Sequence, residues 1–370
     1  MYIGIPKEIK NNEFRVGLTP SSVAELISHG HHVYVQKDAG MGIGFSDSDY
    51  TNIGAEILDN APDIFAKSEM IVKVKEPQAN ECAMLRPGQI LFTYLHLAPD
   101  LKQTKALIKS GAICIAYETV SDDAGQLPLL VPMSEVAGRM SIQAGAFALQ
   151  KSNGGSGLLL GGVAGVEPAK VVIIGAGIVG QNAAQMAIGL GADVVILDKK
   201  IATLRHIDEL FHGRIRTVYS TKEALKNHLI DADLVIGAVL VPGAAAPKLV
   251  SKEMIKDMKK GSAIVDVAID QGGCFATSHA TTHEDPIYIV DDVVHYCVAN
   301  MPGAVARTAT QALNNVTLPY VLKLANLGYK EAFKQDKHLL NGLNVYQGKI
   351  TLLEVAEAHD LEYQAPASML

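Results

Sequence analysis

Four side chains suited to proton transfer or anion binding follow short apolar runs of this sequence. Arg15 lies in a polar segment after the first run, Lys75 and His96 end two later runs, and Asp270 follows another and precedes two glycines. A guanidinium can hold a carboxylate through two parallel hydrogen bonds, and an imidazole titrates near neutral pH. These types suit the binding and protonation of a small carboxylic acid. Each also has an ordinary alternative: a solvated arginine, a paired lysine, a structural histidine, or an aspartate that caps a turn.

A glycine turn with the spacing G-x-G-x-x-G stands between an apolar run and a helical pattern. Gly175 permits a tight turn, Gly177 lets a pyrophosphate approach the backbone, and Gly180 lets the helix lie close to the strand. The helix start offers unpaired N–H groups and a partial positive charge to the phosphates. Asp198, 18 residues after the third glycine, ends the next apolar run and can bind both ribose hydroxyls. This context predicts a dinucleotide site that favours NAD over NADP, although the two lysines after Asp198 weaken the preference.

The first 130 residues alternate strand and helix patterns, which predicts parallel strands with helices on both faces. Thr19 is a candidate N-cap of a helix that runs through Ile27. Alternation along one strand puts Lys73 and Lys75 on the same face, so one of the two can be structural and paired. The strand candidates are residues 2–5, 32–35, 70–74, 90–94 and 112–117.

A run of small residues over 134–150 predicts a helix packed closely on another backbone, which we interpret as crossing between two domains. Beyond it, strand candidates lie at residues 171–174, 194–197, 217–219, 234–238, 263–267 and 295–298. Ligands of this fold class bind outside the carboxyl ends of the strands. The turns expected at the dinucleotide therefore contain Ser220, Val239, Leu240, Val267, Ala268, Ile269, Asp270, Val298, Ala299, Asn300 and Met301. A long helix is expected over 308–327, followed by a short helical tail that packs on the first domain.

Length and composition exclude several classes of protein. The chain has 370 residues, 48% of them apolar, which suits two domains with sizeable cores. Its formal charge of −7 argues against a nucleic-acid partner that relies on bulk charge. No secretory signal or apolar stretch long enough to span a membrane occurs. The four cysteines are far apart, and neither His279 with His283 nor the cluster His29–His32 is completed by other metal ligands. We therefore expect no metal, no membrane association and a cytoplasmic location.

Six segments together resemble a known family at its characteristic spacing. They are Ile5-Pro6-Lys7-Glu8 with Arg15-Val16-Gly17-Leu18-Thr19-Pro20, Val74-Lys75-Glu76-Pro77, Tyr94-Leu95-His96-Leu97-Ala98, the glycine turn, Val267-Ala268-Ile269-Asp270-Gln271-Gly272-Gly273, and Asn300-Met301-Pro302-Gly303-Ala304-Val305. The chain closely resembles, from end to end, the bacterial L-alanine dehydrogenases, a family shared with the NAD-binding subunit of proton-translocating transhydrogenase.

The resemblance implies an α/β fold of two doubly wound domains with an active-site cleft between them. Residues 1–130 with 306–370 would form the substrate domain, and 131–305 a Rossmann NAD-binding domain. It implies reversible oxidation of L-alanine by NAD to pyruvate and ammonium, in a homohexamer. His96 would be the general acid/base and Asp270 its partner, with Arg15 and Lys75 on the substrate. Cofactor contacts would come from Ser134, Ile178, Val179, Asp198, Ser220, Val239, Leu240 and the turns 267–270 and 298–301, besides the glycine turn.

The chain departs from the family pattern at a few positions, and other readings stay open. This chain has Ala306 where relatives commonly have proline, and His279-Ala280 where they often have Arg-Pro. It has Thr203 where some relatives have a basic residue. The departure at His279 leaves open whether that residue contacts the cofactor. The rival functions are a transhydrogenase NAD subunit, a lysine-forming saccharopine dehydrogenase, and an NAD-sensing protein without catalysis. The first and third would not need Arg15, Lys75 and His96 to converge on a substrate.

Overall fold

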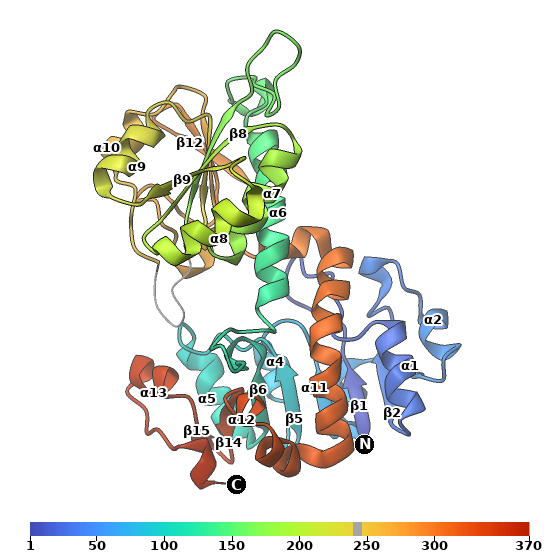
Figure 1. The fold of residues 1–370 in the computed structure, drawn as a ribbon. Coiled ribbons are helices and arrows are strands. Elements are labelled where there is room, and N and C mark those ends of the chain that lie inside the picture. Colours follow the sequence, from blue (N-terminus) through green and yellow to red (C-terminus); the bar gives the residue numbers. More distant parts are fainter. Residues whose placement is uncertain (240–245, 370) are drawn as a thin grey trace. The chain divides into compact units, whose positions relative to one another are not determined.

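The computed structural model describes residues 1–239 and 246–369 and divides the chain into two compact units (Figure 1). Unit 1 consists of Met1–Met133 and Val305–Leu370, and unit 2 of Ser134–Ala304. Each unit is an α/β structure built on one largely parallel sheet. The predicted α/β fold class is therefore confirmed.

Unit 1 has an eight-stranded sheet within the part of the chain that the structure describes, in the order β15-β14-β6-β5-β4-β1-β2-β3. Its strands are β1 (Tyr2–Ile5), β2 (His32–Gln36), β3 (Glu56–Leu58), β4 (Met70–Val72), β5 (Ile90–Thr93), β6 (Ile113–Ala116), β14 (Leu343–Tyr346) and β15 (Lys349–Ile350). The strands from β6 to β3 pair in parallel, and β14 pairs antiparallel with both of its neighbours. The carboxyl ends of β5, β4 and β1 thus lie next to one another at one edge.

The helices of unit 1 are α1 (Pro20–Ser28), α2 (Asp47–Thr51), α3 (Ala61–Lys67), α4 (Ala79–Cys82), α5 (Leu101–Ser110), α11 (Ala306–Gln335), α12 (Lys337–Leu340) and α13 (Leu353–His359). Thr19 caps α1 as predicted, because its hydroxyl accepts a hydrogen bond from the Ser22 N–H. Across the described ranges, we found no helix that combines the length and the apolar character needed to cross a membrane.

The C-terminal part of unit 1 corrects the prediction of a wholly helical tail. Helix α11 continues past Leu327, but Gly328 has φ 71° and ψ 158° and interrupts its regular geometry. Strands β14 and β15 then extend the sheet, with Val345 and Ile350 in the core that contains Leu95 and Leu97. Such short strands have a weak sequence pattern, because only pairing with β6 gives them a partner.

Unit 2 has a seven-stranded sheet among its described residues, in the order β12-β13-β11-β10-β7-β8-β9. Its strands are β7 (Lys170–Ile174), β8 (Asp193–Asp198), β9 (Arg216–Tyr219), β10 (Leu234–Gly237), β11 (Ala263–Asp266), β12 (Ile287–Val290) and β13 (Val293–Tyr296). All neighbours pair in parallel except β12 with β13. The strand order reverses at β7, the point at which doubly wound sheets bind ligands. The prediction missed β12 and placed β13 two residues too late.

The helices that pack on this sheet are α6 (Val131–Ala148), α7 (Ile178–Gly189), α8 (Ile201–Phe211), α9 (Lys222–Leu229) and α10 (Lys252–Lys256). The predicted close packing of the small-residue helix is confirmed in α6. A Cβ atom at Gly138 would lie 2.3 Å from the carbonyl oxygen of Val179, at the start of α7. Only glycine allows the two backbones this approach.

Candidate active site

Three of the four chemically suited residues lie after adjacent strands of unit 1. Arg15 is in the loop after β1, Lys75 follows β4, and His96 follows β5. These strands are parallel neighbours, so their carboxyl ends meet at one edge of the sheet. The Thr93 hydroxyl donates to the Lys75 carbonyl at 2.9 Å and joins two of these ends directly. Asp270 belongs to unit 2 and follows β11.

Arg15 is buried rather than solvated, and the Glu13 carboxylate holds it. The guanidinium donates from Nε to Oε1 at 2.6 Å and from Nη2 to Oε2 at 2.5 Å, and Nη1 lies 3.1 Å from the Met133 sulfur. Burial alone would lower the pKa of Arg15, but the hydrogen bonds and charge of Glu13 outweigh it and raise that pKa. Arg15 is therefore a permanent cation with one edge already bound.

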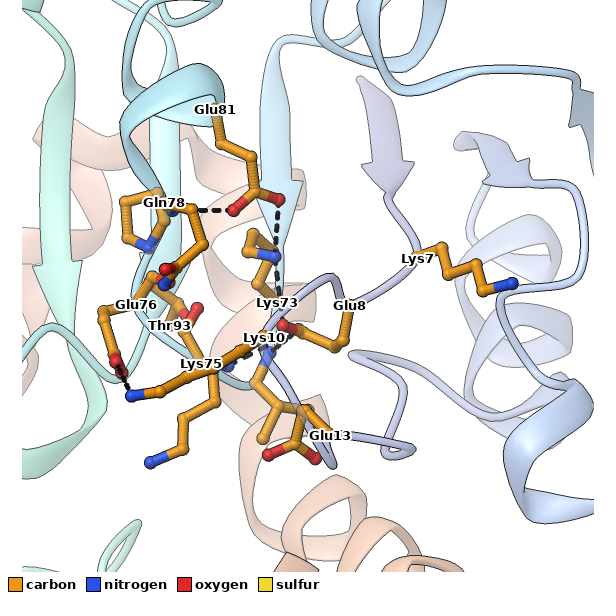
Figure 2. A network of polar contacts seen from close by, with 12 residues as sticks. Lys7, Glu8, Lys10, Glu13, Lys73, Lys75, Glu76, Gln78, Glu81 and Thr93 are labelled. Atoms are coloured by element: carbon orange, nitrogen blue, oxygen red, sulfur yellow. Dashed lines mark hydrogen bonds and ion pairs between the residues drawn. The ribbon is translucent and has the colours of Figure 1, made fainter. Parts of the chain in front are cut away.

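Lys75 lies beside a buried ion network centred on Lys73 (Figure 2). The Lys73 ammonium donates to Glu8 at 3.1 Å and to Glu81 at 2.8 Å. Burial would lower the pKa of Lys73, but the two carboxylates outweigh that effect and raise it. Glu8 also accepts the backbone N–H of Val74 at 2.7 Å and of Lys75 at 3.4 Å. Lys73 is thus structural and paired, as strand alternation allowed, and Lys75 is partly buried.

His96 sits in a turn fixed by the carboxylate of Glu118. Its backbone is left-handed, with φ 48°, which is uncommon for a residue other than glycine. Glu118 accepts the His96 N–H at 2.6 Å and the Leu95 N–H at 3.1 Å, and lies 3.9 Å from the imidazole Nδ1. The His96 ring stacks with the Tyr94 ring, with the two centroids 5.8 Å apart. The His96 side chain is 46% exposed. The backbone of the turn at His96 is thereby fixed, while the side chain is open to solvent.

The glycine turn of unit 2 has the geometry of a phosphate cradle. Gly175 has φ 101°, and a Cβ atom at Gly180 would lie 1.9 Å from the Gly175 carbonyl oxygen. Among the described residues, a Cβ atom at Gly177 would meet no atom within 4 Å, so space lies in front of the backbone there. Helix α7 begins at Ile178 with no side-chain hydrogen bond from its N-cap. The half-buried Ile178 and the buried Val179 form its first turn. The N–H groups of this turn fit the pyrophosphate of a dinucleotide.

Asp198 ends β8 next to this turn. Its carboxylate accepts the Ala176 N–H at 2.8 Å through Oδ2 and the Lys200 N–H at 2.8 Å through Oδ1. The Ser220 N–H donates to the Asp198 carbonyl at 2.9 Å, so β8 and β9 end together. The carboxylate position and the open glycine together fit the ribose and pyrophosphate of NAD.

The remaining turns of unit 2 end beside the same sheet edge. Val239 follows β10, with a methyl 3.2 Å from a Cβ atom built at Gly175, whereas Leu240 lies outside the described residues. Turn Val267–Gln271 carries the exposed Asp270, which accepts the Asn300 N–H at 3.3 Å. That contact joins the turn after β11 to the one after β13, which contains Val298, Ala299, Asn300 and Met301.

Ser134 and His279 lie outside this group of turns. Ser134 is half-buried near the start of α6. His279 is exposed and stacks on Tyr288, with ring centroids 3.7 Å apart. Among residues 1–239 and 246–369, no group of three or more histidine, cysteine, aspartate or glutamate side chains is placed to hold a metal ion.

Sequence reasoning missed the three carboxylates that hold the site residues of unit 1: Glu8, Glu13 and Glu118. A glutamate two residues before Arg15 was a usable signal, because a turn can fold it back onto the guanidinium. Glu8 lies 67 residues from Lys75, and Glu118 lies 22 from His96. No sequence pattern in this chain links Glu8 to Lys75 or Glu118 to His96.

The chain has two α/β units. One has a glycine turn that fits a dinucleotide, and the other has a sheet edge that carries a histidine suited to proton transfer. These features define the class of dinucleotide-dependent oxidoreductases. The model of the N-terminal domain described as alanine dehydrogenase/PNT matches residues 4–137, and the model of the C-terminal domain matches residues 141–352. The chain therefore belongs to the alanine dehydrogenase/PNT family, and it is an oxidoreductase.

Individual relatives agree with this assignment. The chain is 58% identical over 370 residues to an alanine dehydrogenase from Halomonas elongata, covering 100% of both chains. It is 55% identical over 364 residues to one from Methanococcus maripaludis, covering 98% of each. A solved L-alanine dehydrogenase superposes with a TM-score of 0.94 at 51% identity, over 97% of this chain and 99% of that one. A transhydrogenase from Sinorhizobium meliloti (TM-score 0.84, 24% identity, 95% and 100% covered) shares the fold.

Proposed function

We propose that the chain is an NAD-dependent L-alanine dehydrogenase acting reversibly. L-alanine, NAD⁺ and water would give pyruvate, ammonium, NADH and a proton. The observation that carries the proposal is the row of adjacent strand ends that bears Arg15, Lys75 and His96. The names of relatives that match the chain along its whole length support alanine as the substrate.

The residues of unit 1 would divide the work by chemical type. Arg15 would hold the substrate carboxylate, since the guanidinium is a permanent, oriented cation. Lys75 would stabilise negative charge on the carbonyl oxygen of pyruvate. His96, partly exposed and fixed at its backbone, would relay protons as water adds to the imine and ammonia leaves.

Unit 2 would supply NAD and a second carboxylate. The nicotinamide, when bound, accepts the hydride from Cα of alanine. Gly177 and the first turn of α7 would hold the pyrophosphate, and Asp198 would hold a ribose, with Ser220 in the turn after β9 on the same side. The turns after β10, β11 and β13, across the reversal of strand order at β7, would hold the nicotinamide half, with Ser134 as a further contact. Asp270 would orient the water or the amine. The reaction requires Asp270 and the residues of unit 1 to reach the same substrate molecule, because hydride transfer needs reacting atoms about 3–3.5 Å apart.

NADH absorbance measured with different amino acids tests the proposal. Alanine should reduce NAD⁺ rapidly, glycine and serine slowly, and lysine not at all. No alanine-dependent signal from folded protein that binds NADH would refute the proposal and favour the NAD-sensing alternative. Hydride transfer between two dinucleotides without alanine would favour a transhydrogenase subunit.

We further propose a homohexamer located in the cytoplasm. One segment of unit 2 exposes apolar side chains, which supports an interface between subunits. They are Leu159, 66% exposed, Val163, 61% exposed, and Val166, 58% exposed. Light scattering should give six times the monomer mass. A monomer at micromolar concentration would contradict the hexamer.

A further inference from the structure

We propose that Asp266, the last residue of β11, is a positioning residue for Asp270. Its buried carboxylate joins the two ends of the short loop that carries Asp270, and it thereby sets where the Asp270 side chain lies. The inference rests on the proposed role of Asp270 in orienting the water or the amine. Asp266 itself would touch neither substrate nor cofactor.

The carboxylate of Asp266 accepts hydrogen bonds from three donors of one segment. Its Oδ2 atom accepts the Cys274 N–H at 2.9 Å, the Phe275 N–H at 3.4 Å and the Ser278 hydroxyl at 2.6 Å. The turn that carries Asp270 lies between Asp266 and these donors in the chain. The carboxylate therefore holds both ends of the loop that contains Asp270.

Burial makes these hydrogen bonds strong and directional. Asp266 is 0% exposed. Burial also raises the pKa of Asp266 above its ordinary value, but Oδ2 can accept the three bonds whether or not Oδ1 carries a proton. Because buried N–H groups strongly favour a paired state, the segment is held at the position where it meets the carboxylate.

Two glycines provide the space in which this carboxylate lies. A Cβ atom at Gly273, which has φ 77°, would lie 2.4 Å from Oδ2 of Asp266. A Cβ atom at Gly237, the last residue of β10, would lie 3.1 Å from Oδ1. Atoms packed this closely leave the carboxylate little room to shift, so that its position defines the position of the bound segment.

Lys248 holds the end of the same loop. Its ammonium donates to the Gly272 carbonyl at 2.5 Å and to the Phe275 carbonyl at 3.1 Å. The Gly272 N–H donates in turn to the Ile269 carbonyl at 2.9 Å. Asp270 lies between Ile269 and Gly272, so a displacement of this end of the loop would move Asp270 as well.

Asp270 is exposed, so its position depends on its backbone turn more than on packing around its side chain. Its carboxylate accepts the Asn300 N–H at 3.3 Å. The segment that Asp266 binds continues to His283, whose Nε2 atom lies 3.2 Å from the Asn300 carbonyl oxygen. The segment that starts at Asp266 thus reaches the neighbour of Asp270 as well as the loop of Asp270 itself.

A double-mutant cycle tests this inference. Asp270→Asn should lower kcat for alanine oxidation at least about tenfold. Asp266→Ala should also lower kcat at least about tenfold, because a displacement of about 1 Å in a catalytic group can cost that much. In the double variant, kcat should stay within about twofold of that of Asp270→Asn, because the group that Asp266 positions is already lost. Equal losses from Asp266→Ala in both backgrounds would overturn the inference.

The same measurements separate this inference from the proposed function. No alanine-dependent formation of NADH by the wild type would refute the proposed function. A wild-type kcat in Asp270→Asn would overturn the role of Asp270 and this inference with it. A lowered kcat in Asp270→Asn together with a wild-type kcat in folded Asp266→Ala would overturn only the role of Asp266.

Asp233→Ala is the matched control in the same unit. Asp233 is 7% exposed and accepts the Lys170 N–H at 2.8 Å, at the edge where β7 and β10 begin. Asp233→Ala should lower the urea midpoint of unfolding, as Asp266→Ala should, but its kcat should stay within about twofold of the wild type. A comparable loss of kcat in both folded variants would overturn the inference.

The conservative variant Asp266→Asn should restore most of the activity. Its amide oxygen can take the place of Oδ2 and accept the same three donors. Its kcat should therefore lie within about threefold of the wild type. A kcat as low as that of Asp266→Ala would overturn the inference, because the acceptor would be present without its effect.

Ser278→Ala covers the case in which Asp266→Ala does not fold. It removes the shortest of the three hydrogen bonds and leaves Cys274 and Phe275 with their acceptor. Its kcat should fall at least about threefold, with no further loss when it is combined with Asp270→Asn. In that case, a wild-type kcat in Ser278→Ala would overturn the inference.

Discussion

The two units fix their candidate site residues by different physical means. In unit 1, carboxylates hold the site: Glu13 binds Arg15, Glu8 binds the backbone at Lys75, and Glu118 binds the turn at His96. In unit 2, the backbone forms the site, through glycines and the first turn of α7. Asp198 adds one carboxylate, which itself accepts backbone N–H groups.

The difference matches what each ligand would need. A small carboxylic acid offers few atoms for binding. Its position and reaction must therefore be defined by a few side chains, and in unit 1 carboxylates hold those side chains in place. A dinucleotide offers a long pyrophosphate that backbone donors can bind without any charged side chain. Unit 1 should therefore be sensitive to changes of charge, and unit 2 to added volume.

The largest expected effect separates chemistry from cofactor binding. His96→Ala should lower kcat by about 10²- to 10⁴-fold, the usual contribution of general acid–base catalysis. The affinity for NADH, measured by fluorescence titration, should stay unchanged because the glycine turn lies in the other unit. Near-normal turnover would remove His96 from the mechanism.

The buried network predicts the next effect, on stability. Lys73→Met should lower the free energy of unfolding by about 3–5 kcal/mol, because Glu8 and Glu81 would lose their common cation. Urea unfolding followed by circular dichroism measures the loss. Lys260→Met removes an ammonium that is 86% exposed and paired with Asp292, and it should change stability little. Equal stability of the two variants would show that the network is not needed for folding.

Added volume at the glycine turn tests unit 2. Gly177→Ala should weaken NADH binding about tenfold or more and leave stability within about 1 kcal/mol, because the new Cβ meets no atom of the described residues within 4 Å. In Gly189→Ala, at the other end of α7, the new Cβ likewise meets no atom within 4 Å in the part of the chain that the structure describes, and NADH binding should stay unchanged. If both variants bound NADH as the wild type does, the pyrophosphate would not approach Gly177.

The smallest expected effect concerns pH. Burial would raise the pKa of Glu76, but the charges of Lys75 and Lys10 outweigh it, so that the pKa lies below its ordinary value. A lowered pKa contributes stability that is present above the unfolded pKa, about 4.3, and is lost as the pH falls through the folded value. Glu76→Gln should therefore reduce the loss of stability below about pH 4.3 by about 1 kcal/mol or less, since Lys10 is 43% exposed. Urea unfolding at a series of pH values measures the free energy of unfolding of both proteins. The same loss of stability below about pH 4.3 in the wild type and in Glu76→Gln would contradict this assignment.

Much of the fold was predictable because its signals are local. The apolar runs of β1, β5, β7 and β10 appear directly in the sequence, and so does the cap of α1 by Thr19. Strand β12 was not predicted, because its residues are only partly buried and its pairing with β13 alone defines it as a strand. The cofactor contact expected at Leu240 stays a prediction, and so do the roles of all the other site residues.

The sequence alone determined the alternation of strands and helices, the glycine turn with Asp198, and the types of the four reactive side chains. These features depend on the order of residues over about 30 positions or fewer. The tertiary structure decided which strands became neighbours, that Arg15 is buried on Glu13, and that Lys73 forms buried ion pairs with Glu8 and Glu81. Such features depend on burial and on charges from distant segments, because a carboxylate and its partner acquire their interaction energy only when folding removes both from water.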